Sequence, residues 1–186
     1  MQYLVASKGA AGQLPVDARL VADGEMISFE QPWTFGLPLI ARLDDKVSPD
    51  TLKPSLAGFN AFTVDGLEEA GKGEAFVIGA HIIRDAEAYR PYIAAVADVV
   101  ASFGGRFIAR AGKVTPIAGS FVPERVVLIE FPGVVDALAF YTSERYAPLL
   151  KIRLTTTEAR FVIMMRSGGW PAPVRAAADA YLRRSN

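Results

Sequence analysis

The stretch Arg125-Val126-Val127-Leu128-Ile129-Glu130-Phe131 decides how the rest of the chain is interpreted. Alternate residues of a β-strand point to opposite faces, so this strand has one wholly apolar face. Its other face carries Glu130, a carboxylate that follows apolar neighbours. This second face is therefore where we first look for chemistry.

Composition predicts a globular chain of one domain or two small ones, with 186 residues, 51% hydrophobic and 22% charged. Twenty basic residues balance twenty acidic ones, so no nucleic-acid partner is expected. The absence of cysteine excludes disulfides, thiolate nucleophiles and cysteine-bound metals, and it is compatible with a reducing cytoplasm. The N-terminal residues make a poor signal peptide, and no apolar run reaches the ~18 residues that cross a bilayer, so we expect a cytoplasmic protein without membrane contact.

The strongest element pattern lies between residues 75 and 165. Strands are predicted at 75–83, 106–110, 125–131 and 159–165, and helices at 85–103 and 134–153. The β-α-β-β-α-β order indicates an α+β, ferredoxin-like domain with an antiparallel sheet in strand order 4-1-3-2. Both helices would cover one sheet face, so the other face needs a cover.

The N-terminal residues are rich in Gly and Pro and give weaker signals. Strands are predicted at 2–6, 26–30, 36–43 and 59–65, and short helices at 15–22 and 48–53. We therefore divide the chain into a β-rich segment 1–70, a ferredoxin-like domain 73–166 and a C-terminal helix within 170–186. The order in 1–70 is also that of a degenerate ferredoxin-like copy, which leaves two alternatives: an irregular arm or a shrunken second copy.

The central domain resembles a known family, the bacterial domain of unknown function 1330 within the dimeric α/β-barrel superfamily. The resemblance covers about residues 73–165. It is carried by Glu87-Ala88-Tyr89, Gly104-Gly105-Arg106-Phe107, Arg110 with Gly112, Pro123 with Arg125, Ile129-Glu130-Phe131-Pro132, and Phe140-Tyr141-Thr142-Ser143 with Tyr146 and Arg153. The family usually has Trp where this chain has Phe140, and Pro91 is unusual in the first helix.

The resemblance implies that the bare sheet face pairs with a second sheet to close a barrel. A homodimer is the expected arrangement, with an intramolecular tandem barrel, completed by residues 1–70, as the alternative. The resemblance implies no reaction, because the family has none assigned.

Strand parity suggests which residues would line that barrel. We expect these side chains to face the helices: Phe76, Ile78, Phe107, Ala109, Val127, Ile129, Phe131, Phe161 and Ile163. The opposite face would then gather ionisable groups from all four strands: His81, Arg106, Arg110, Glu130 and Arg160. Either these groups line a polar cavity, or they form structural ion pairs at an interface.

The leading hypothesis is a cofactor-independent acid–base enzyme, of isomerase, lyase, cyclase or oxygenase type, acting on a small anionic or carbonyl-containing molecule. Glu130 or His81 would be the base, and Arg106, Arg110 and Arg160 would bind substrate. Tyr89 and Tyr141 either reach the pocket or pack in the core. No metal site is expected from a single histidine. The alternative is a non-catalytic small-ligand-binding or dimer-forming protein with structural barrel charges.

Overall fold

A computed structural model describes residues 1–34 and 36–185. The strands are β1 (Gln2–Ser7), β2 (Arg19–Ala22), β3 (Met26–Ser28), β4 (Pro38–Leu43), β5 (Ala61–Asp65), β6 (Ala75–Ile83), β7 (Arg106–Arg110), β8 (Val114–Ala118), β9 (Arg125–Phe131) and β10 (Thr157–Met165). The helices are the 3₁₀ helix η1 (Lys8–Gln13) and α1 (Pro49–Leu56), α2 (Ala86–Ser102), α3 (Val134–Thr142), α4 (Ala147–Thr156) and α5 (Ala172–Ser185). The strands form two antiparallel sheets: sheet A, in the order β2-β4-β1-β5-β8, and sheet B, in the order β3-β10-β6-β9-β7.

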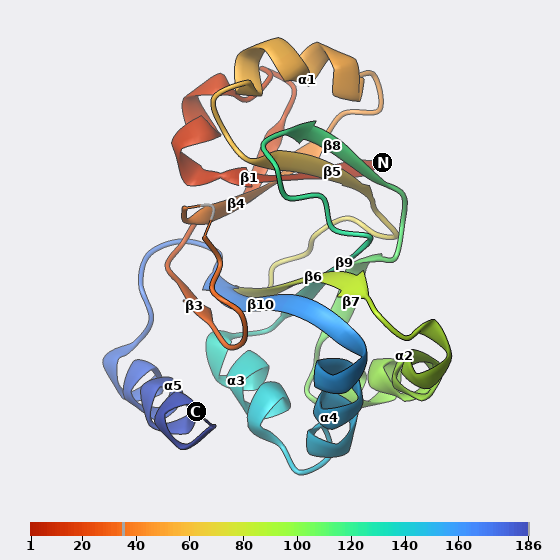
Figure 1. Cartoon of the computed structure of the whole chain (residues 1–186). Coiled ribbons are helices and arrows are strands. Elements are labelled where there is room, and N and C mark those ends of the chain that lie inside the picture. Colours follow the sequence, from red (N-terminus) through yellow and green to blue (C-terminus); the bar gives the residue numbers. More distant parts are fainter. Residues whose placement is uncertain (35, 186) are drawn as a thin grey trace.

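Sheet B confirms the ferredoxin-like prediction. Its strands β10-β6-β9-β7 have the predicted 4-1-3-2 order, and α2, α3 and α4 lie on the side away from sheet A (Figure 1). Asp85 caps α2 by accepting a hydrogen bond from the backbone nitrogen of Ala88 (3.0 Å). Pro91 lies inside α2, which runs unbroken across it. The helices bury their apolar side against one face of sheet B.

Sheet A has the same strand order once β8 is set aside, since β5-β1-β4-β2 is again 4-1-3-2 for the strands that residues 1–65 contribute. The helix predicted at 15–22 is wrong. That position holds a turn and the edge strand β2, and a short 3₁₀ helix at Lys8–Gln13 stands between β1 and β2. Two glycines in Lys8–Gln13 disfavour a longer α-helix there. In contrast, α1 extends beyond Pro54 to Leu56.

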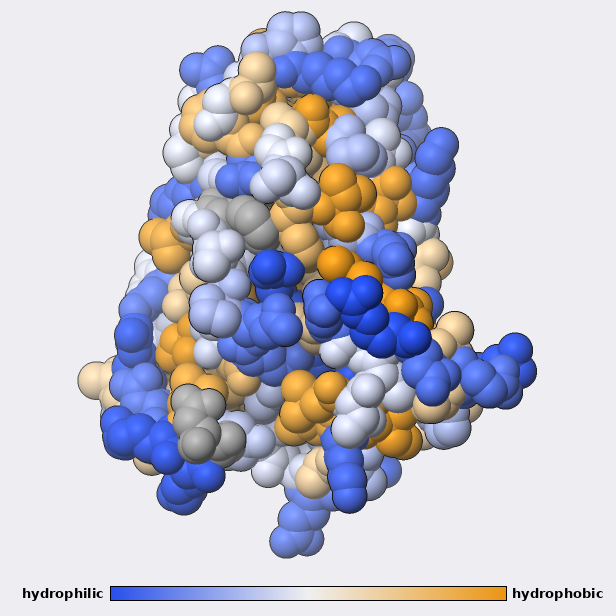
Figure 2. Space-filling model, in the orientation of Figure 1, coloured by the Kyte–Doolittle hydropathy of each residue, from blue (hydrophilic) through white to orange (hydrophobic). Residues whose placement is uncertain are grey.

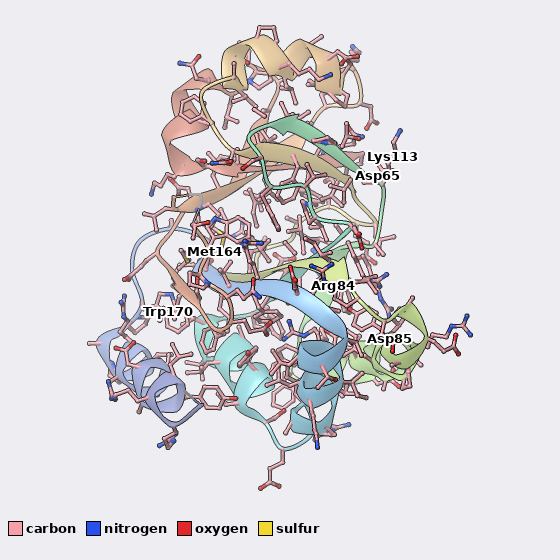
Figure 3. All side chains as sticks on the ribbon, viewed as in Figure 1. Asp65, Arg84, Asp85, Lys113, Met164 and Trp170 are labelled. Carbon is pink, nitrogen blue, oxygen red and sulfur yellow. The ribbon has the colours of Figure 1, made fainter. Side chains whose placement is uncertain are left out.

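Each half of the chain gives one strand to the other sheet. Between β2 and β4, strand β3 crosses to pair with β10, and between β7 and β9, strand β8 crosses to pair with β5. Both crossings turn at a glycine in close backbone contact. A Cβ on Gly24 would lie 2.6 Å from the carbonyl oxygen of Met165, and one on Gly112 would lie 2.5 Å from that of Asp65. Figure 3 shows Asp65 beside Lys113, whose carbonyl accepts the Asp65 amide hydrogen (3.1 Å).

The space between the sheets is filled by apolar side chains. This inter-sheet core consists of Tyr3, Val5, Val21, Ala22, Trp33, Ile40, Phe62, Val64, Phe76, Ile78, Ala80, Ile108, Ala109, Val126, Leu128, Val162 and Met164. Hydrophobic residues reach the surface in Figure 2 only as small groups between hydrophilic ones. Sheet A therefore covers the face of sheet B that the helices leave free. The sheets stay separate, so the expected closed barrel is not formed.

Two strands of sheet B contradict the expected parity. In β6, Val77 pairs with Ile129 and Gly79 with Val127, so Phe76 and Ile78 face sheet A and His81 faces the helices. The sequence does not reveal this one-residue shift in side-chain parity, because β6 is apolar on both faces.

The second correction comes from a β-bulge in β7. The register shifts between Phe107 and Ala109, which turns Ala109 toward sheet A and Arg110 toward the helices. Of the five ionisable groups expected on one face, Arg106, Glu130 and Arg160 lie on the side of sheet A, whereas His81 and Arg110 lie on the opposite side.

Candidate functional site

The carboxylate of Glu130 lies at the end of β9 and is only 3% exposed. It accepts hydrogen bonds from the backbone nitrogens of Gly71 (2.9 Å) and Gly73 (2.7 Å), and from the guanidinium groups of Arg106 and Arg166. A carboxylate has about four acceptor positions, so these four donors occupy them. Glu130 is therefore engaged as the centre of a clamp.

The two arginines of this clamp are engaged as well. Arg106 also donates to the carboxylate of Glu68 (2.6 Å), and Arg166 donates to the carbonyls of Gly73 (2.7 Å) and Val21 (3.2 Å). These contacts tie the linker between β5 and β6 to the ends of β7, β9 and β10. The Glu130 cluster thus has the geometry of a structural joint between the two halves.

His81 lies apart from Glu130, in the layer between sheet B and the helices. Its ring is 1% exposed, 3.5 Å from Nη1 of Arg153 and 6.4 Å from the ring of Tyr89. Burial, followed by the positive charges of Arg153 and Arg125, lowers the pKa of His81 well below its usual 6.5. The imidazole is therefore neutral at neutral pH.

The other expected substrate-binding groups are scattered. Arg110 donates to the carbonyl of Ile93 (2.8 Å) on α2. The guanidinium of Arg160 lies 4.1 Å from the ring centroid of Phe121, on the side of sheet A. Tyr89 is buried in α2, and burial raises the pKa of its hydroxyl. A pocket of about 160 Å³ lies beside Glu130 and Arg106, and Arg110, Arg160 and Tyr89 are not among its described lining residues.

A second polar cluster is centred on Arg153 of α4, which is fully buried. Its two terminal guanidinium nitrogens donate hydrogen bonds to Glu30, one to each carboxylate oxygen. Its Nε donates to the hydroxyl of Tyr146 (3.0 Å). The side chain of Glu30 is 4% exposed. The two halves of the chain thus meet in a buried ion pair, since Glu30 follows β3 in the N-terminal half.

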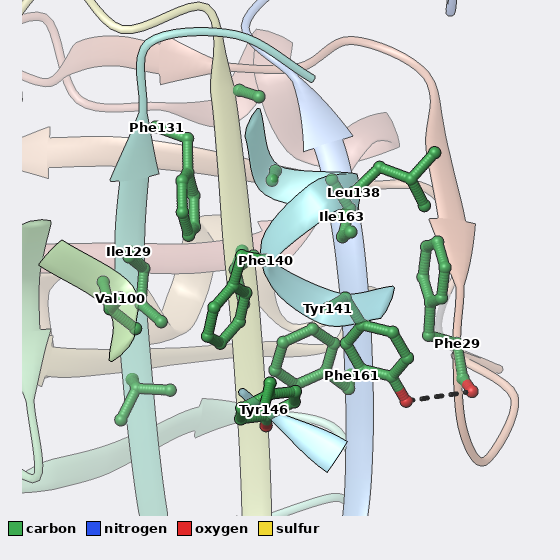
Figure 4. Packing of buried hydrophobic residues seen from close by; sticks show 14 of the residues in the cluster. Phe29, Val100, Ile129, Phe131, Leu138, Phe140, Tyr141, Tyr146, Phe161 and Ile163 are labelled. Atoms are coloured by element: carbon green, nitrogen blue, oxygen red, sulfur yellow. Dashed lines mark hydrogen bonds between the residues drawn. The ribbon is translucent and has the colours of Figure 1, made fainter. Parts of the chain in front are cut away.

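Tyr141 completes this cluster. Its hydroxyl donates to Oε1 of Glu30 (3.0 Å) and also lies 3.4 Å from the carbonyl of Phe29, a contact drawn in Figure 4. Burial, and then the negative charge of Glu30, raises the pKa of Tyr141. The phenol therefore keeps its proton, and it orients Glu30 together with Arg153.

A pocket of about 260 Å³ opens onto this cluster. It lies where β10, α4 and α5 meet the end of β3. It is lined by Phe29, Glu30, Gln31, Tyr141, Leu150, Leu154, Thr157, Ala159, Tyr181 and Leu182. Apolar walls with a few convergent polar groups are typical of a small-molecule site. We call this cavity the Glu30 pocket.

Sequence reasoning placed Tyr141 among the candidates but missed Glu30 and Arg153. Arg153 had a signal, because it continues the apolar helical stripe of Tyr146 and Leu149, and an arginine on a buried stripe needs a buried partner. Glu30 had none, since only the crossing of β3 into sheet B brings it there.

Among residues 1–34 and 36–185, no group of three or more histidine or acidic side chains is arranged to hold a metal ion. Within the same residues, no helix is both long and apolar enough to cross a membrane.

Comparison with known proteins gives one family and one structural neighbour to report. The family model described as "Domain of unknown function (DUF1330)" matches residues 74–167. None of the curated proteins matches the chain. A solved structure titled as that of a major regulator of staphylococcal pathogenesis aligns with a TM-score of 0.47 and 12% identity, over 87% of this chain and 98% of that one.

Proposed function

The chain belongs to the DUF1330 family, and from that premise we propose that it binds a small, largely apolar organic molecule in the Glu30 pocket. One observation carries the proposal: a pocket of about 260 Å³ with a mixed, mainly apolar lining has a buried carboxylate and a phenol hydroxyl at its floor. A buried ion pair contributes little net stability compared with apolar side chains, so its position at a pocket floor favours a role in recognition.

The cavity described within the inter-sheet core is much smaller than the Glu30 pocket. The cavity found there between Val5, Trp33 and Phe121 has a volume of about 10 Å³, roughly that of one water probe. The expected anionic substrate also loses its support, because Arg106 and Arg110 are bound by protein groups. The proposed site therefore lies on the helix side of sheet B and not in the interior of a barrel.

Acid–base chemistry without a cofactor remains the second candidate. Among the described hydrogen bonds, Oε1 of Glu30 accepts from Arg153 and Tyr141, whereas Oε2 accepts from Arg153 alone. Oε2 therefore has a further acceptor position with which to take a substrate proton. A carboxylate is a weak base, so the substrate would need a readily lost proton, such as that of an enol or of a carbon between two carbonyls.

The family resemblance implies a homodimer or, as the alternative, a tandem arrangement completed within one chain. This proposal includes the tandem arrangement. Sheet A already covers the bare face of sheet B within one chain. We therefore propose that sheet A takes the place of a second subunit by covering the free face of sheet B. We also propose that the Glu30 pocket is complete in a single chain.

Occlusion of the pocket tests the binding proposal. Leu154 lines the pocket and is 52% exposed, so Leu154→Trp can fill the entrance without disturbing the core. The matched control is Leu67→Trp, at a 60% exposed position outside the lining residues. In a ligand-observed NMR screen of small aromatic fragments, we expect hits that survive Leu67→Trp and disappear in Leu154→Trp. Fragments that bind both variants equally well would show that binding occurs elsewhere.

A further inference from the structure

The chemistry at the floor of the Glu30 pocket restricts the class of ligand. Three polar groups of the lining are buried: the carboxylate of Glu30, the hydroxyl of Tyr141, and the hydroxyl of Thr157, which donates to the backbone carbonyl of Arg153 (2.8 Å). Both terminal nitrogens of Arg153 donate to Glu30, and the Tyr141 hydroxyl donates to the same carboxylate. The donors of these buried groups are therefore directed at protein acceptors, and what the floor offers a ligand is lone pairs. Gln31, whose amide can also donate, is an exposed residue of the lining.

The formal charges in and behind the lining also restrict the class of ligand. Glu30 is the one formally charged side chain among the described residues that line the pocket. The positive charge that balances it, on Arg153, is fully buried behind it. An organic anion would have to approach a carboxylate at close range in an apolar surrounding, which is unfavourable. A ligand ammonium group is also disfavoured. Arg153 cancels most of its attraction to the Glu30 carboxylate, and the apolar walls remove its water of hydration.

The walls favour a flat ligand of limited size. The ring of Phe29 lies 4.7 Å from that of Tyr141 and 6.5 Å from that of Tyr181, so aromatic faces border one side. Leu150, Leu154 and Leu182 border the rest of the cavity together with Ala159 and Thr157. A cavity of roughly 150 Å³ is known to hold benzene, so about 260 Å³ holds one ring with substituents.

We infer that the Glu30 pocket recognises a neutral, hydroxyl-bearing aromatic or enol compound, whose hydroxyl donates to Oε2 of Glu30 while its ring packs against Phe29 and the leucines. This inference rests on the proposed function, and it replaces the unspecified small molecule with a stated class. It also assigns Glu30, Tyr141 and Arg153 as the residues that determine specificity, Arg153 by holding Glu30 in place.

Three probes of similar shape separate this class from its alternatives. 4-Methylphenol has the donor hydroxyl, 4-methylanisole has the same ring with the donor capped by a methyl group, and 4-methylbenzoate is an anion. Each is titrated at pH 7 into the full-length wild-type protein, and the ¹³C-methyl signals of Leu150, Leu154 and Leu182 report occupancy. Dissociation constants come from the titration curves.

The inference predicts that 4-methylphenol binds about tenfold more tightly than 4-methylanisole, as a hydrogen bond to a charged acceptor would give, and that 4-methylbenzoate binds most weakly. If the probes move the pocket methyl signals but the ether binds as well as the phenol, or the benzoate binds best, the pocket stands and the ligand class is wrong. If none of the three moves those signals, the pocket proposal fails together with the inference.

Discussion

At the residue scale, Glu130 and Glu30 are two glutamates whose buried carboxylates have different surroundings. Both are buried glutamates paired with arginine. Both line a pocket, but Glu130 accepts hydrogen bonds from two backbone amides and two arginines, which occupy its acceptor positions, whereas Oε2 of Glu30 accepts from Arg153 alone. The sequence singled out Glu130 because strand alternation exposes an odd carboxylate. It could not reveal Glu30, whose surroundings come from residues more than a hundred positions away.

Glu130→Gln tests the clamp. The substitution places an amide NH₂ among four donors, so at least one hydrogen bond to a charged acceptor is lost, and we expect the free energy of unfolding to fall by about 2 kcal/mol. Urea denaturation measures the loss, and amide hydrogen exchange at Gly71 and Gly73 should accelerate. Binding of 4-methylphenol should remain unchanged. Lost binding with unchanged stability would instead make Glu130 a ligand-binding residue.

The Glu30–Arg153 pair should behave as a coupled unit. Glu30→Gln leaves a fully buried guanidinium without its counter-charge, which costs about 3 kcal/mol. Arg153→Met leaves the carboxylate uncompensated at a similar cost. The double variant should be more stable than the sum of the single losses by about 2 kcal/mol, measured by urea denaturation of all four proteins. Additive losses would mean that the two groups do not depend on each other.

His81 should make the protein sensitive to mild acid. Its pKa is lowered in the folded state, so below its usual 6.5 the unfolded chain takes up the proton first and gains stability. Lowering the pH from 7 to 5 should therefore cost the wild type about 2 kcal/mol more than His81→Asn. The comparison of the two pH dependences removes the contribution of the acidic groups. Parallel curves would show that His81 titrates normally in the folded protein.

At the scale of elements, the sequence predicted most strands and helices of residues 73–166 but misjudged two faces. Strand β9 alternates clearly, and its parity is right. Strand β6 is apolar on both sides, so the sequence holds no information about which side meets the helices. The bulge in β7 is also silent in the sequence, because Phe107, Ile108 and Ala109 fit either face. The N-terminal elements were harder because several are short: β2 has four residues and β3 has three, too few for a clear alternation.

The crossing between β2 and β3 depends on Gly24. A methyl group there would lie 2.6 Å from the carbonyl oxygen of Met165, so Gly24→Ala should lower the free energy of unfolding by about 2 kcal/mol. Gly58→Ala is the matched control, because a Cβ there meets no atom within 4 Å. We expect it to be neutral or to stabilise by about 0.5 kcal/mol. Equal effects in thermal denaturation would argue against the tight crossing.

At the scale of the whole molecule, two units of the same strand order are interlocked. Each sends one strand into the other's sheet, and they share the inter-sheet core and the Glu30–Arg153 pair. The sequence suggested the second copy only as an alternative. The helix that it predicted at 15–22 is a turn and strand β2, and the short 3₁₀ helix η1 is what stands between β1 and β2. The exchange of β3 and β8 was beyond prediction, because it depends on sheet-to-sheet contact rather than local pattern.

This interlocking predicts a single unfolding transition. Trp33 lies in the inter-sheet core, and Trp170 packs in the core between sheet B and the helices, so each reports on a different layer. In Trp170→Phe and Trp33→Phe variants, the remaining tryptophan should give coincident urea midpoints once each variant's own stability is measured by circular dichroism. A fluorescence midpoint that departs from the circular dichroism midpoint of the same variant would mean that the layers unfold independently.

The proposed ligand pocket lies between the helices and sheet B, while apolar side chains fill the space between the two sheets. Titration of the full-length protein with 4-methylphenol, followed by ¹³C-methyl NMR, tests this placement most directly. We expect shifts at Leu150, Leu154 and Leu182, with little change at Ile78 and Leu128. Shifts concentrated at Ile78 and Leu128, with the pocket leucines unmoved, would contradict it.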